Sequence, residues 1–108
     1  MDLEKLMVDT LQIPMVKAFQ PLTPPCVTCY AASDETALFG DGKEAEMIET
    51  FQVDIWDRNE NVVKILAKKL KRRLIADEHA VSDVSYLYDN NGKVWHASLT
   101  FTVISEEE

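Results

Sequence analysis

The run of residues 46–56 constrains the fold more than any other part of this sequence, because apolar and polar side chains alternate along it. Phe51, Val53 and Ile55 would point to one side of an extended chain, and the polar residues between them to the other. At about 3.3 Å per residue this strand spans more than ~30 Å, which is longer than a usual strand. We therefore expect a sheet with one buried face, and we expect part of this strand to project beyond it with a loop at 33–43.

Two segments have the three- and four-residue spacing of apolar side chains that is typical of amphipathic helices. The first is 2–13, which an aspartate can cap and Pro14 ends. The second runs from about 62 to 74, with Asn59 or Asn61 as its cap. Each helix would bury one stripe of apolar side chains: Leu3, Leu6, Met7 and Leu11 in the first, and Val63, Leu66, Ala67, Leu70 and Leu74 in the second.

The remaining segments predict shorter strands, a hairpin and a loop. The expected strands are 15–19, 26–32, 84–89 and 93–104, the loop is 33–43, and the acidic tail is 105–108. Asn90, Asn91 and Gly92 give the turn of a closing hairpin. Hairpins make antiparallel neighbours, and each helix has one apolar stripe to bury. The sequence therefore predicts an α+β fold, with a mostly antiparallel β-sheet, two helices packed on one face and a long extended loop between two strands, in a single domain over 1–108.

Composition narrows the classes of function. A chain of 108 residues has room for one hydrophobic core, and it carries 19 acidic against 11 basic residues for a formal net charge of -8. That charge argues against wrapping of DNA and against binding to anionic membranes. The chain has neither a long apolar run nor a signal-peptide pattern at its start, so we expect it to stay in the cytoplasm where it is made, with no membrane contact.

The two cysteines form a CxxC motif, which can be redox-active or can bind zinc. The alternating strand that contains them would place Cys26 and Cys29 about 10 Å apart on opposite faces, beyond the reach of a disulfide. No second pair of zinc ligands accompanies them. We therefore expect both to be structural, reduced thiols.

The histidines and carboxylates show no recognisable catalytic spacing. His79 lies in a turn, and His96 lies on the strand face opposite Trp95. No serine elbow or glycine-rich phosphate loop accompanies them, so we expect no enzyme activity, no metal and no cofactor. The weakest of three functional hypotheses is a small enzyme that uses His96 with Asp54. The carboxylates of Asp54 and Asp57 could do acid-base work, but a polar sheet face followed by a helix entry explains them better.

The helix at 62–74 is strongly basic. Six of the 11 basic residues lie within ten positions: Lys64, Lys68, Lys69, Lys71, Arg72 and Arg73. We expect Lys64, Lys68, Lys71 and Arg72 to stand opposite the apolar stripe, with the other two flanking it. This positive face could be merely solvated, could contact an acidic protein surface or could bind nucleic acid. Ile65 and Ile75 lie on the same polar side, which favours a protein interface.

The order of these elements resembles one family. An opening Met-Asp-Leu-Glu-Lys-Leu helix, a proline-rich connector into Cys-Val-Thr-Cys-Tyr, a Gln-Val-Asp-Ile-Trp strand, a basic amphipathic helix and a closing Trp-His-Ala-Ser-Leu-Thr-Phe-Thr-Val strand follow one another. This pattern resembles the tail-terminator, or tail-completion and head-to-tail joining, proteins of long-tailed bacteriophages and prophages. The resemblance covers nearly the whole chain.

That resemblance implies a structural ring, commonly of six subunits, on the end of the tail tube. The ring would stop tube polymerisation and bind the head connector in the neck of the virion, while DNA passes through its lumen. Its interfaces would involve the basic helix and the acidic loop, where Asp34, Glu35 and Asp41 lie. The alternative hypothesis is a small nucleic-acid-binding or regulatory module that uses helix 62–74.

Overall fold

The computed structural model describes residues 2–17, 20, 23–39 and 44–107, which form two helices and six strands. In chain order these are α1 (Leu3–Leu11), β1 (Met15–Val16), β2 (Cys26–Phe39), β3 (Glu44–Asp57), α2 (Glu60–Ala76), β4 (Ala80–Val81), β5 (Ser85–Asp89) and β6 (Val94–Glu107). All the predicted helices and strands are present. The predicted strand 15–19 is strand only over Met15–Val16 among the described residues, and β4 was not expected.

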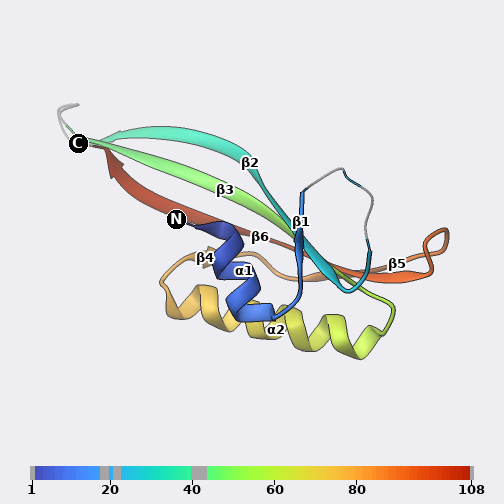
Figure 1. The fold of residues 1–108 in the computed structure, drawn as a ribbon. Coiled ribbons are helices and arrows are strands. Elements are labelled where there is room, and N and C mark those ends of the chain that lie inside the picture. The colour runs from blue at the N-terminus through green and yellow to red at the C-terminus, as the bar shows by residue number, and fades with distance from the viewer. Residues whose placement is uncertain (1, 18–19, 21–22, 40–43, 108) are drawn as a thin grey trace.

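The strands form one sheet in the order β1-β2-β3-β6-β4, and β5 pairs with another part of β6. β1 runs parallel to β2, and the other neighbours are antiparallel. Both helices lie on the same side of the sheet, as Figure 1 shows. The predicted α+β fold, with a mostly antiparallel sheet and two helices on one face, is confirmed.

Local signals explain where the helices begin and end. The Asp2 carboxylate accepts a hydrogen bond from the Lys5 amide at 3.0 Å, and Gln12 ends α1 in the left-handed conformation with φ of 57°. Asn59 caps α2, because its side chain accepts from the amides of Asn61 and Val62. The second helix is therefore longer than the predicted 62–74 by two residues at each end.

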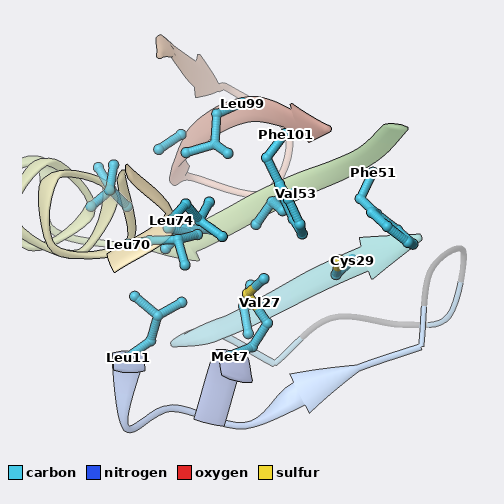
Figure 2. Packing of buried hydrophobic residues seen from close by; sticks show 14 residues of the cluster. Met7, Leu11, Val27, Cys29, Phe51, Val53, Leu70, Leu74, Leu99 and Phe101 are labelled. Atoms are coloured by element: carbon cyan, nitrogen blue, oxygen red, sulfur yellow. The ribbon is translucent and has the colours of Figure 1, made fainter. Parts of the chain in front are cut away.

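The core lies between the two helices and one half of the sheet. Figure 2 shows the core side chains of both helices pointing toward those of β2, β3 and β6. The phenyl rings of Phe51 and Phe101 stack at 5.2 Å between centroids. They are the last buried residues of β3 and β6 before these strands extend beyond the core. The buried members are Met7, Leu11, Val27, Cys29, Phe51, Val53, Ile55, Val63, Ala67, Leu70, Leu74, Ala97, Leu99 and Phe101.

The predicted loop over 33–43 is wrong over most of its length. β2 continues to Phe39 and β3 begins at Glu44, while residues 40–43 lie outside the described part of the chain. The predicted acidic tail is likewise strand as far as Glu107, which pairs with Ala45. Polar composition suggested a loop at both places, but β3 offers an unpaired backbone on each side, and cross-strand hydrogen bonding outweighs weak strand propensity.

These extensions form a three-stranded arm, made of residues 33–39 of β2, 44–50 of β3 and 102–107 of β6. A shift in register between Ala31 and Ser33 marks where the arm begins on β2. None of the fully buried residues of the described core lies in the arm, and Figure 1 shows the arm running away from both helices. The molecule is accordingly elongated, with extents of 53 × 26 × 22 Å.

Candidate assembly surfaces

α2 presents a cationic face to solvent, because burial of Val63, Ala67, Leu70 and Leu74 fixes the rotation of the helix on the sheet. Three basic residues on the far side of the helix are exposed: Lys68, Lys69 and Arg72. None of the three forms an ion pair with a side chain that the structure describes. Their charge is therefore available to a partner.

Lys64 and Lys71 lie at the margin of this face rather than at its centre, which corrects the sequence-based assignment. Both are half-buried, because each is one helical turn from the buried Ala67. The Lys64 ammonium lies 2.8 Å from a Glu60 carboxylate oxygen and 5.8 Å from the centroid of the Tyr86 ring. The hydrogen bond that Lys64 donates to Glu60, followed by the negative charge of Glu60, raises the pKa of Lys64. Lys69 belongs to the outer face in their place.

Two isoleucines interrupt the positive charge. Ile65 is 64% exposed and Ile75 is 56% exposed. Ile65 precedes Lys68 by three residues, and Ile75 follows Arg72 by three residues. The four side chains therefore lie one after another along the helix surface. We call this set, Ile65, Lys68, Arg72 and Ile75, the outward stripe of α2. Exposed apolar side chains among cations are typical of protein interfaces rather than of a solvated face.

The acidic residues predicted for the loop fall on the arm. Asp34 and Glu35 lie in β2, and Asp41 falls outside the described residues. The register places Asp34 directly opposite Glu49, and Glu46 directly opposite Glu106. Like charges directly opposite one another destabilise a sheet. Sequence reasoning missed these pairs, because only the strand register reveals them.

The structure brings together Asp54 and His96, the pair from the weakest of the functional hypotheses. His96 Nε2 lies 2.5 Å from Asp54 Oδ1. Both residues alternate along their strands with core residues that face the helices, so they lie on the sheet face that carries no helix. Gln52 joins them by donating to Asp54 Oδ1 at 3.1 Å and to Ser98 Oγ at 2.6 Å. The indole of Trp56 stacks on the imidazole at 4.0 Å between centroids, nearly parallel at 5°. A carboxylate that orients an imidazole is a common element of acid-base catalysis.

The same contacts also give this cluster a structural role. The side chains of Asp54 and His96 are 14% and 18% exposed, so the network holds β3 and β6 together where no helix covers them. His79, the other histidine, lies after α2 as predicted and is half-buried, with its ring 6.0 Å from that of Phe101. Its backbone amide donates to the Leu74 carbonyl, which fixes the exit from the helix.

The CxxC cysteines lie on β2 as predicted. Cys29 faces the helices within the core cluster, whereas Cys26 is buried outside it, and both thiols are free. Burial, with a smaller contribution from the Asp54 carboxylate, raises the pKa of Cys29 to about 12. Burial also raises the pKa of Cys26. Neither thiol is therefore activated as a nucleophile, since the thiolate is the reactive species.

Other features of the described residues offer little chemistry. An open hollow of about 260 Å³ lies between α1 and the end of α2, where it is lined by Asp2, Lys5, Leu6, Asp9, Arg73 and Asp77. Within the described ranges, no group of three or more histidine, cysteine or carboxylate side chains is placed to hold a metal ion. None of the described helices is long and apolar enough to cross a membrane.

Comparisons with known proteins show a shared fold but assign the chain to no family. No protein-family model matches the chain, and no curated protein matches it. Among solved structures, the chain is similar to a chain from the "Virion of native gene transfer agent (GTA) particle", with a TM-score of 0.50 and 12% sequence identity. The match covers 99% of this chain and 87% of the virion chain, so the fold of the virion chain is shared across both proteins nearly throughout.

Proposed function

We propose that this protein is a structural component of a phage-like particle, in which copies of the chain assemble side by side. The observation that carries the proposal is the arm, since three strands extend beyond the core without a helix to cover them. An isolated sheet with little buried apolar surface gains stability when another chain packs on it. The shared fold with a chain of a gene transfer agent virion supports the same proposal.

In its more specific form, the proposal is a tail terminator. Subunits form a ring, six in the form that the resemblance implies, which caps the tail tube, ends its polymerisation and binds the head connector in the neck region. DNA passes through the lumen without specific binding. The surplus of 19 acidic over 11 basic residues supports passage of DNA, because like charge keeps it from adhering. The arm and the outward stripe of α2 make two different surfaces on one subunit, which suits a heterologous contact that closes into a ring.

A second candidate follows from the exposed charges of α2. Lys68, Lys69 and Arg72 have no described ion-pair partner, so they could neutralise phosphates. Ile65 and Ile75 on the same face favour a protein partner instead. We propose no enzymatic role for Asp54 and His96, because their contacts with Gln52 and Trp56 account for both side chains in the sheet.

Sedimentation and light scattering of the purified full-length chain test the proposal, with electron microscopy of the largest species. We expect a discrete ring at high protein concentration. A chain that stays monomeric at all concentrations, and binds duplex DNA with an affinity that falls steeply with salt, would favour the nucleic-acid candidate.

The tail-terminator form needs a second measurement. Tail tubes that assemble in the presence of the protein should have a uniform length and should carry the ring at one end. Tubes of unregulated length with no ring bound would contradict that form while leaving the broader structural role in place.

A further inference from the structure

The arm carries a charge that nothing in its own strands balances. In sequence, its three strands contain seven acidic residues and no basic one: Asp34, Glu35, Glu44, Glu46, Glu49, Glu106 and Glu107. Two pairs of them are direct cross-strand partners, Asp34 with Glu49 and Glu46 with Glu106. Because such pairs repel, the arm is more stable when cations lie close to it.

The complementary charge lies on α2. This helix carries six basic residues and one acidic residue, Glu60, which pairs with Lys64 at the margin. On the outward stripe Lys68 and Arg72 have no described carboxylate partner, and two exposed isoleucines add apolar area beside them. A surface with both kinds of side chain can bind a partner through charge and through burial.

The arm and the stripe of one chain do not meet, because the arm runs away from both helices (Figure 1). Contact between them therefore requires two copies. We infer that the acidic arm of one subunit docks on the outward stripe of α2 in a neighbouring copy. This inference rests on the proposed function, which requires copies to associate, and it names the two surfaces that meet.

Direct pairing of arm edges is the competing arrangement, because β2 and β6 are the outer strands of the arm. That arrangement would place two edge strands that both carry acidic residues side by side, with Asp34 and Glu35 on β2 and Glu106 and Glu107 on β6. Charged edge strands resist such pairing. Docking on α2 instead places the acidic strands of the arm next to cations, and it links unlike surfaces of successive copies as a closed ring requires.

Charge reversal in pairs tests the inference on the full-length chain. A stripe variant, Lys68→Glu with Arg72→Glu, changes two exposed positions that pack against nothing in the core. An arm variant, Glu35→Lys with Glu44→Lys, Glu46→Lys and Glu49→Lys, turns both like-charge cross-strand pairs into opposite-charge pairs and leaves four basic against three acidic residues in the arm. We expect each variant alone to associate at least tenfold more weakly than the unchanged chain, as measured by sedimentation at low salt, and to remain folded by circular dichroism.

Mixing the two variants in equal amounts is the decisive step. An acidic stripe then meets a basic arm, and a basic stripe meets an acidic arm, so alternating copies should recover association. The matched control for the stripe variant is Lys17→Glu with Lys93→Glu, which makes the same change in net charge at two exposed positions away from α2. This control should associate within about threefold of the unchanged chain, as expected for exposed charges outside the interface.

The outcomes separate this inference from the proposed function. An unchanged chain that never associates would defeat the proposed function, and the inference with it. If the unchanged chain forms rings but both variants assemble equally well, only the inference fails, and pairing of arm edges becomes the better account. Rings that form normally in the stripe variant but no longer bind tail tubes would show that α2 docks on another protein, which also overturns docking on a second copy.

Discussion

The two halves of the long strands β2, β3 and β6 differ in what stabilises them. In one half, Val53, Leu99 and Phe101 are buried against two helices. In the arm, Ile104 is 60% exposed, and the register pairs Asp34 with Glu49 and Glu46 with Glu106. Burial of apolar surface against the helices stabilises the first half, whereas in the second half the described contacts are mainly cross-strand hydrogen bonds, with Val103 packed at the edge of the core. The comparison teaches that the core stabilises only one half of these strands, and under our proposal a neighbouring subunit completes the arm.

Truncation of one large side chain in each half should give the largest contrast. Phe101 is 1% exposed and Ile104 is 60% exposed, and both lie on β6. Phe101→Ala should lower the free energy of unfolding by about 3–5 kcal/mol, because it leaves a cavity in the core. Ile104→Ala should change it by less than about 0.5 kcal/mol, since little buried area is lost. Urea unfolding measures both, and equal effects would contradict the division into two halves.

The polar network on the helix-free face should give the next largest effect. Asp54→Ala removes the acceptor that both Gln52 and His96 contact. We expect a loss of about 1–3 kcal/mol, because half-buried polar groups lose their partners. Asp57→Ala is the control of the same residue type, since the Asp57 carboxylate accepts from the exposed Asn59 amide. If both substitutions cost the same, the network does not hold the strands together.

The pH dependence of stability tests whether the Cys29 thiol is buried in the covered half of the sheet. Its pKa is about 12 in the folded chain against an ordinary value of 9.0. The unfolded chain therefore loses this proton first, and stability that is complete below pH 9 falls as the pH rises toward 12. At pH 10 the loss should be about 1 kcal/mol. Urea unfolding of Cys29→Ala over the same pH range should lack this part of the pH dependence; an identical slope in both proteins would contradict burial of the thiol.

The charge pairs of the arm should give the smallest effect. Glu49→Lys replaces a like-charge partner of Asp34 by an opposite one. In the isolated subunit we expect stabilisation of about 0.2–1 kcal/mol, measured at low salt by urea unfolding. The gain should shrink as salt screens the charges. A destabilisation would mean that Glu49 makes a favourable contact within its own chain.

The covered half could be predicted from sequence because its signals are local and mutually consistent. Alternation along 46–56, the stripe of α2 and the turn at Asn90-Asn91-Gly92 each specify one element, and every predicted stripe residue of α2 except Leu66 is fully buried. Leu66 is partly buried against the same cluster. These patterns work because burial imposes a period on the sequence.

The arm could not be predicted in the same way. Its residues at 33–39 read as a loop because Ser33, Asp34 and Glu35 have weak strand propensity, yet pairing with β3 makes them strand. The contact between Asp54 and His96 was reachable only as a guess, since it depends on the register that places Asp54 opposite Ser98 and beside His96. Wherever function depends on which residues of distant strands lie opposite one another, a single sequence does not contain the answer.

Hydrogen exchange of the backbone amides in the arm, compared between the dilute monomer and the assembled protein, tests the account most directly. Residues 33–39 and 102–107 form the outer strands of the arm, and residues 51–55 lie in the core. We predict that the outer arm amides exchange at least tenfold more slowly in the assembly, while the core amides are slow in both states. Arm amides that are equally slow in the monomer and in the assembly would contradict the claim that a neighbouring subunit completes the arm.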